Sequence, residues 1–168
     1  MTPLSQMLKA MRREALRPRH QRAYEAARKR RRALLGYRTP SALVEILGNR
    51  DGALVERKDE LLRAFIAEQQ GSASPLWLAL SLLCCAPMLG RLRRRILADE
   101  VSEAELDQLV MAGFVDAVAT FPIARHRRRT FARIRKATER SVFGQIARWQ
   151  RDRELQPATD PSLFDCLD

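Results

Sequence analysis

The sequence predicts an all-α protein that folds as a compact helical bundle. No segment alternates between apolar and polar residues for long enough to form a β-strand. Helix start and stop signals recur along the 168 residues, and 46% of the residues are hydrophobic, which is enough to bury a core. Seven glycines and eight prolines are too few for a linker or a low-complexity chain.

Capping patterns divide the chain into seven expected helices. Thr39 and Ser74 each precede a proline, which is favoured at the first position of a helix. Ser102 and Glu105 have the spacing of a capping box, in which each side chain satisfies a free backbone N–H group of the other residue. The expected helices span residues 4–16, 20–35, 40–47, 53–70, 75–97, 103–120 and 128–153.

The helix over residues 75–97 is apolar on all sides as far as Arg91, as is typical of a helix at the centre of a bundle. Residues 69–90 carry no charge, but the continuous apolar part, 75–90, is shorter than the roughly 20 residues that a membrane span needs. We therefore expect a buried core helix, with Trp77 in the core and Cys84 and Cys85 as small buried hydrophobes.

The helix over residues 103–120 has two apolar strips. The first is the expected core stripe, formed by Leu106, Leu109, Val110, Gly113, Phe114, Ala117, Val118 and Phe121. The outer face carries Glu103, Glu105, Asp107 and Asp116, and between these lie Gln108, Met111, Ala112 and Val115. Two interpretations of this second strip stay open: another helix of the same chain covers it, or it binds a partner protein.

The helix over residues 128–153 separates apolar from basic side chains. One side carries Phe131, Ile134, Thr138, Val142, Ile146 and Trp149. The other carries Arg129, Arg133, Lys136, Arg140 and Arg151, which fall within about 60° of one another. Phe143 borders the apolar side. A charge run is often only a solvated face, but this one has almost no acids, and unpaired like charges destabilise a helix unless a polyanion neutralises them. The pattern therefore favours nucleic-acid contact.

Basic residues occur in blocks. The 31 Lys and Arg residues outnumber the 20 Asp and Glu residues, for a formal charge of +11 that favours polyanionic partners. Residues 91–95 read R-L-R-R-R, and residues 125–153 hold eleven bases and two acids. We divide the chain into a basic N-terminal helical extension (1–36), a helical domain (37–155) and an acidic C-terminal tail (156–168). Binding of the N-terminal extension to an anionic membrane is a weaker alternative.

Enzyme and metal motifs are not found in the sequence. Three cysteines, two of them adjacent, without C-x-x-C spacing argue against a disulfide framework or a zinc site and fit reduced thiols in a cytosol. The sequence has no phosphate-binding glycine loop, H-E-x-x-H pattern or nucleophile elbow. We therefore expect a cytoplasmic, nucleoid-associated protein that is not an enzyme, needs no cofactor or metal, and does not bind a membrane.

The last three helices, in their order, resemble region 2 of the bacterial sigma-70 family, especially its extracytoplasmic-function members. The family's middle helix reads approximately E-D-L-V-Q-E-x-F-x-x-A-W, and its last helix begins approximately R-T-W-L-x-R-I. The matching positions here are Leu109, Val110, Phe114, Ala117, Arg129, Thr130, Arg133 and Ile134, the last helix with about one residue of slippage. The family's polar pair after Leu-Val is Met111-Ala112 here, and its two tryptophans are Val118 and Phe131. The resemblance covers about residues 53–153 and includes no second, helix-turn-helix domain.

The resemblance implies a sigma factor-like, DNA-binding transcription protein. Its last helix would hold DNA, single-stranded where the promoter opens, through Arg127, Arg128, Arg129, Arg133, Lys136, Arg140, Phe143 and Arg151. Its middle helix would contact the RNA polymerase core through Asp107, Gln108, Met111, Ala112 and Val115. The alternative is a nucleic-acid-binding structural or assembly protein that uses this fold without touching polymerase. The sequence predicts no oligomeric state.

Overall fold

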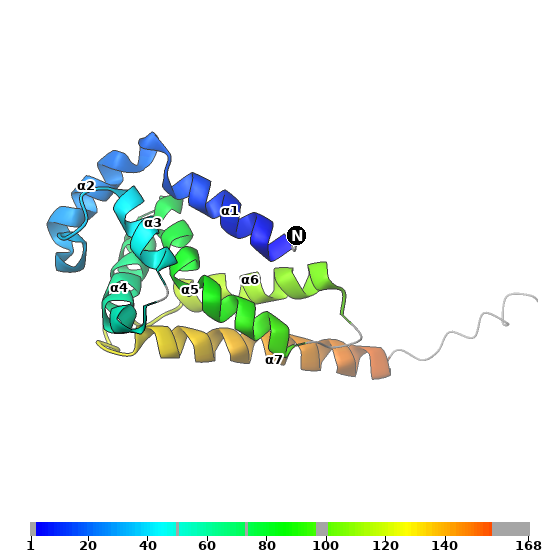
Figure 1. Cartoon of the computed structure of the whole chain (residues 1–168). Helices are drawn as coiled ribbons and strands as arrows, with labels where there is room; N and C mark the ends of the chain where they lie inside the picture. Colours follow the sequence, from blue (N-terminus) through cyan, green and yellow to red (C-terminus); the bar gives the residue numbers. More distant parts are fainter. Residues whose placement is uncertain (1–2, 50, 73, 97–100, 156–168) are drawn as a thin grey trace, which may run out of the picture.

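The computed structural model describes residues 3–49, 51–72, 74–96 and 101–155, and within these ranges all regular structure is helical (Figure 1). The seven α-helices are α1 (Pro3–Ala15), α2 (Gln21–Arg30), α3 (Pro40–Gly48), α4 (Val55–Gly71), α5 (Pro75–Arg95), α6 (Glu103–Ala119) and α7 (Thr130–Leu155). Three short 3₁₀ turns, η1 (Pro18–His20), η2 (Arg32–Leu34) and η3 (Gly52–Leu54), join the early helices. The expected all-α class is confirmed.

Several expected helix boundaries differ from the structure, and two of the differences have a clear backbone cause. The predicted helix over 20–35 breaks at Arg31, whose backbone is extended (φ −114°, ψ 107°), so that α2 is followed by the separate turn η2. The last helix begins at Thr130 rather than 128, because Arg129 adopts a left-handed φ of 60° that cannot continue a helix. The predicted end of the fifth helix at 97 lies outside the described residues.

Helix α5 lies at the centre of the bundle and contacts α1, α3, α4, α6 and α7. It is the one described helix that is long and apolar enough to span a membrane, but 61% of its apolar window is buried within the protein. The indole of Trp77 is almost fully buried, with ring centroids 6.3 Å from Tyr24 and 6.4 Å from Phe65. The expectation that α5 is a core helix, with Trp77, Cys84 and Cys85 buried, is confirmed.

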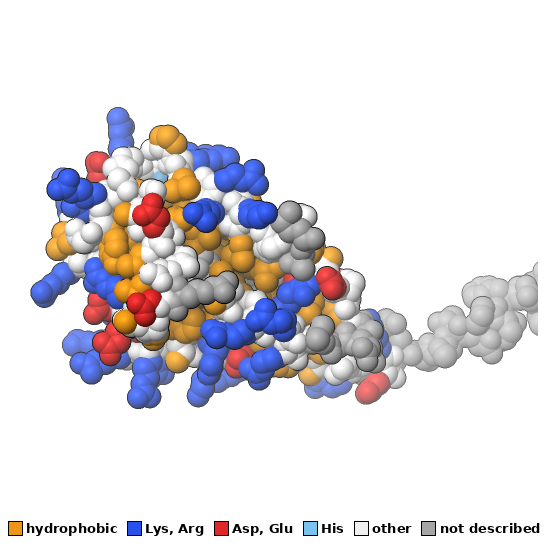
Figure 2. All heavy atoms as spheres, viewed as in Figure 1, with side chains coloured by type: hydrophobic (Ala, Val, Ile, Leu, Met, Phe, Trp, Pro, Cys, Tyr) orange, Lys and Arg blue, Asp and Glu red, His pale blue; other side chains and the backbone are white. Residues whose placement is uncertain are grey.

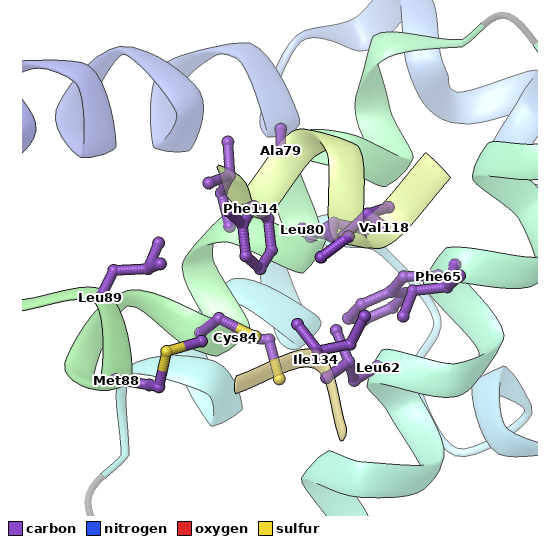
Figure 3. Close-up of a cluster of buried hydrophobic side chains, with 14 of the residues drawn as sticks. Leu62, Phe65, Ala79, Leu80, Cys84, Met88, Leu89, Phe114, Val118 and Ile134 are labelled. Atoms are coloured by element: carbon purple, nitrogen blue, oxygen red, sulfur yellow. The ribbon is translucent and has the colours of Figure 1, made fainter. Parts of the chain in front are cut away.

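Side chains of α4, α6 and α7 meet those of α5 in the core, as Figure 3 shows. Leu62 and Phe65 come from α4, Phe114 and Val118 from α6, and Ile134 from α7. Residues of the basic N-terminal segment belong to the same core cluster, namely Leu4, Ala15, Tyr24, Ala27 and Leu34. The described part of residues 1–36 therefore packs into one core with the rest of the chain.

A buried carboxylate ties α2 to α4. Glu68 is almost fully buried, and its two oxygens accept hydrogen bonds from Arg30 Nη2 and Arg31 Nε, each at 2.7 Å. Burial alone would raise the pKa of Glu68, but the two arginines outweigh burial and hold the pKa below its ordinary value of 4.5. Folding therefore favours the charged form of this residue.

Glu68→Gln should consequently change how stability depends on pH. A carboxylate whose pKa is lower in the folded state contributes stability above the unfolded-state pKa, and the contribution is lost as the pH falls through the folded-state pKa. We expect the variant to be less stable than the wild type at pH 7 and the difference to shrink below pH 4.5, measured by urea unfolding at several pH values. A constant difference across this range would contradict the pairing; the exposed Glu45→Gln is the control.

Two glycines should respond oppositely to added side-chain atoms. At Gly113 of α6 a Cβ atom would lie 3.2 Å from Val142 Cγ2 and 3.3 Å from Ser141 Cβ on α7, so Gly113→Val should destabilise the fold by about 1–3 kcal/mol. At Gly144, on the outer face of α7, a Cβ atom would meet nothing within 4 Å. Gly144→Ala should therefore stabilise the protein by up to about 1 kcal/mol through helix propensity. Urea unfolding measures both, and a neutral Gly113→Val would show that α6 and α7 are not so close.

Candidate nucleic-acid interface

The start of α7 is held by side chains of α4. The Asp59 carboxylate accepts hydrogen bonds from the backbone N–H groups of Thr130 (3.2 Å) and Phe131 (2.7 Å). Two of the free N–H groups of the first turn are thereby satisfied, and the negative charge lies at the positive end of the helix dipole. Arg63 Nη1 donates to the carbonyl oxygens of Ile123 (3.0 Å) and His126 (2.6 Å) in the preceding loop. The loop and the first turn of α7 are thus fixed to the core.

The predicted basic face of α7 is exposed. The residues concerned are Arg133, Lys136, Arg140 and Arg151 on α7 and the loop residues Arg127, Arg128 and Arg129 just before it, and all are exposed. Among the described residues, no carboxylate lies within 4.0 Å of Arg129, Arg133, Lys136 or Arg140; the described ion pairs all involve other residues. Arg151 Nε donates to the Ala147 carbonyl at 3.2 Å. Arg129, Arg133, Lys136 and Arg140 therefore form a row of like charges without a carboxylate partner in the part of the chain that the structure describes.

The end of α5 widens this basic surface. Arg95 Nη1 pairs with Glu139 of α7 at 3.0 Å, and Arg135 Nε lies 4.0 Å from the same carboxylate. This contact places the exposed residue Arg95 at the side of α7. Figure 2 shows Lys and Arg side chains gathered along the lower edge of the molecule, where α7 runs in Figure 1. The R-L-R-R-R run was visible in the sequence, but nothing there placed it beside α7.

The aromatic side chains of α7 only partly follow the expectation. Phe143 is 44% exposed next to the basic face, in agreement with its position at the border of the apolar side. Trp149, at the end of the apolar side of this helix, is 37% exposed and not covered by the core. Helix α7 has 26 residues and is longer than α6, which has 17. Trp149 therefore lies only beside the first turn of α6, next to Glu105. Phe131 is half-buried, packed against the core.

Two of the five residues expected on the partner-binding face of α6 are not on the surface. Asp107 is 2% exposed: its Oδ2 accepts the Leu4 N–H of α1 at 2.8 Å, and its Oδ1 accepts from Arg93 Nε of α5. Met111, one turn further along, is also buried. Helix α1 packs against α6 here, so the expected outward position of Asp107 is wrong, and at Met111 the interpretation that another helix of the same chain covers the strip holds.

The rest of that face is open. Gln108, Ala112 and Val115 are exposed and follow i, i+4, i+7 spacing, which places them on one side of α6. The acids Glu105 and Asp116 are exposed on the same side. Each interpretation of the strip therefore holds for a part of it. Helix α1 covers one edge, at Met111, whereas Gln108, Ala112 and Val115, with acidic neighbours, remain accessible to a partner.

No protein family, curated protein or solved structure matches this chain. Within the described ranges no group of three His, Cys, Asp or Glu side chains lies close enough to hold a metal ion.

Proposed function

We propose that this protein binds nucleic acid through the basic face of α7 and acts as a sigma factor-like transcription protein at the nucleoid. The observation that carries the proposal is the row of exposed cations, Arg129, Arg133, Lys136 and Arg140, without a carboxylate partner among the described residues. Repulsion within this row destabilises the free protein, and a polyanion removes that repulsion.

The length of the row suits a phosphate backbone better than a small anion. From Arg133 to Arg140 the helix rises about 10 Å, at 1.5 Å per residue, and Arg129 extends the row from the loop just before the first turn of α7. Duplex DNA carries one negative charge per about 1.7 Å of its axis, so several phosphates fall within that length. Arg127, Arg128 and the end of α5 extend the surface beyond the row. An extended polyanion can therefore meet all of these cations together.

Salt dependence tests the phosphate contacts. Arg133→Ala with Arg140→Ala should reduce the slope of log affinity against log salt by about 1.4 on single strands and about 1.8 on duplex, because two contacts no longer release counterions. Fluorescence anisotropy with labelled oligonucleotides measures the slope. The matched control is Arg22→Ala with Arg38→Ala, two exposed arginines outside α7. A double variant of α7 that keeps the wild-type slope would rule out this face.

A melting role predicts a separate effect at Phe143, the exposed aromatic residue beside Arg140. If its ring stacks on an unpaired base, Phe143→Ala should cost on the order of 1–3 kcal/mol on single-stranded DNA and little on duplex. Binding titrations with a strand and its duplex measure the two costs. Equal losses on both would leave a phosphate-binding protein without a melting function.

Contact with polymerase through α6 is what the resemblance to sigma region 2 implies. The apolar positions that match the family, Leu109, Val110, Phe114 and Ala117, are buried, so they support a common way of packing helices rather than a common partner. The accessible row Gln108, Ala112 and Val115 supplies the surface for the partner.

The alternative function is a structural or assembly role on nucleic acid without polymerase. The position of α1 favours it, because α1 covers Asp107 and Met111 on the face that the resemblance assigns to polymerase. Under this alternative the basic face of α7 still binds nucleic acid, and α6 contributes only to the packing of the fold.

A pull-down with the core polymerase separates the two functions. Under the sigma-like proposal the wild type is retained, and Ala112→Arg with Val115→Glu loses retention while staying folded, because a charge enters the apolar row. Ala26→Arg with Ser41→Glu makes the same charge changes at exposed positions of α2 and α3 and should be retained. A folded wild type that binds oligonucleotides but not polymerase would instead establish the alternative.

A further inference from the structure

A cavity of about 830 Å³ opens beside α5, between α1, α3, α4 and the first turn of α7. The buried part of its lining is apolar and consists of Val44 and Leu47 of α3 and Cys84 of α5. Figure 2 shows hydrophobic side chains gathered in the middle of the face that carries α3 and α5, with Lys and Arg side chains around them. The volume is within the range of about 300–1,000 Å³ in which proteins hold small molecules.

One side of α5 supplies both an apolar and a cationic end of this cavity. Leu83, Pro87, Gly90, Arg91 and Arg94 line it and follow i, i+4, i+7, i+8, i+11 spacing, which places them on one side of the helix. From Leu83 to Arg94 the helix rises about 16 Å, at 1.5 Å per residue. A ligand that matches this side of α5 is therefore apolar at one end and anionic at the other.

The cationic end is exposed and without a carboxylate partner. Arg91 and Arg94 are exposed, as is Arg12 of α1, which lines the same cavity. In the described ranges no carboxylate lies within 4.0 Å of these three guanidinium groups. A guanidinium group can hold a carboxylate through two parallel N–H···O hydrogen bonds, so the rim suits a ligand carboxylate.

The two other charged groups of the lining are bonded to the chain itself. Lys58 Nζ donates to the carbonyl oxygens of Leu47 and Asn49. The Asp51 carboxylate accepts the N–H group of Ala53 at 2.9 Å. With four cations and one carboxylate on its lining, the cavity as a whole attracts an anion.

We propose that this cavity binds the anion of a free fatty acid, with the alkyl chain on Val44, Leu47 and Leu83 and the carboxylate on Arg91 and Arg94. A single chain suits a site that has one apolar end and one cationic end. A phospholipid of a bilayer, by contrast, keeps its chains in the membrane and offers only its head group. The inference does not depend on the proposed function, because the exposed cations of α7 do not line the cavity.

Isothermal titration of the full chain with dodecanoate, below its micelle concentration, measures the binding. From octanoate through decanoate to dodecanoate, we expect the affinity to rise about fourfold for each added methylene group, because each one is buried in the cavity. Dodecyltrimethylammonium carries a similar chain with a cationic head and should bind about tenfold more weakly or less. Equal affinity for the two head groups, or an affinity independent of chain length, would overturn the proposal.

Two kinds of variant test the two ends of the site. Arg91→Ala with Arg94→Ala should weaken dodecanoate binding by about tenfold or more, because hydrogen bonds between charged groups are lost. The matched pair Arg22→Ala with Arg38→Ala, at exposed arginines outside the cavity, should leave the affinity unchanged.

Gly90→Leu fills the cavity without changing its charge. A Cβ atom at Gly90 would come no closer than 3.8 Å to its nearest neighbour, Arg94 Nη1, so the larger side chain has room to extend into the cavity. This variant should lose dodecanoate binding. Gly71→Leu is the control, because a Cβ atom at that exposed position meets nothing within 4 Å. Circular dichroism confirms folding, and an unchanged affinity in the folded Gly90 variant or in the folded arginine pair would overturn the proposal.

Methyl NMR spectra locate the ligand on the full chain. Dodecanoate should shift the methyl signals of Val44, Leu47 and Leu83 and leave those of Leu106 and Ile146, which do not line the cavity, nearly unchanged. Shifts that are largest at Leu106 and Ile146 would show binding elsewhere on the protein and would overturn the proposal.

Flotation with vesicles of phosphatidylglycerol distinguishes a free fatty acid from a membrane. The proposal predicts that Gly90→Leu floats with the vesicles to the same extent as the wild type, because a bilayer lipid does not enter the cavity. Loss of flotation in Gly90→Leu, with no dodecanoate bound by the wild type, would assign the cavity to a membrane lipid and overturn the proposal. Loss of the oligonucleotide salt effect, by contrast, would contradict only the proposed function.

Discussion

The apolar surface of α5 is the constraint on which the rest of the fold depends. Because this helix carries hydrophobic side chains around its whole circumference as far as Arg91, every side of it must be covered to remove that surface from water. Helices α1, α3, α4, α6 and α7 together cover most of this surface, and Leu83, Ala86 and Pro87 line a cavity that stays open. Their polar faces consequently point outward, which leaves the cations of α7 on the surface.

Two carboxylates connect this core to the candidate functional faces. Asp59 on α4 and Asp107 on α6 each accept backbone N–H groups from the first turn of a helix distant in sequence, α7 and α1 respectively. In both cases a negative charge satisfies free donors at the positive end of a helix. Asp59 fixes where the basic face begins, and Asp107 brings α1 over one edge of α6. A carboxylate that accepts backbone N–H groups thus holds the start of the basic face of α7 in one case, and in the other brings α1 over part of the surface of α6.

Most of the helices could be predicted because their signals are local. The capping box of Ser102 and Glu105 forms as its spacing indicates, and the Thr39 hydroxyl accepts the Ala42 N–H at 3.3 Å. The exposure of Arg133 and Arg140 follows from the helical period alone, since Ile134 and Val142, on the opposite side, are buried.

The predictions from sequence fail where the burial or pairing of a residue depends on an element that is distant in sequence. Asp107 occupies an outward position on an isolated α6, and only the arrival of α1 and Arg93 buries it. Trp149 continues the apolar stripe of α7, but α6 is too short to cover it. The pairing of Arg95 with Glu139, which adds the end of α5 to the basic surface, joins residues 44 positions apart and has no local signal.

The central claim, that the outward face of α7 meets nucleic acid, is tested most directly by an NMR titration of the isotope-labelled protein with a single-stranded oligonucleotide. The account predicts that the backbone amide signals of Arg133, Lys136, Arg140 and Gly144 change most, while those of Gln108 and Ala112 on α6 stay nearly unchanged. The largest changes on α2, with α7 unaffected, would contradict it.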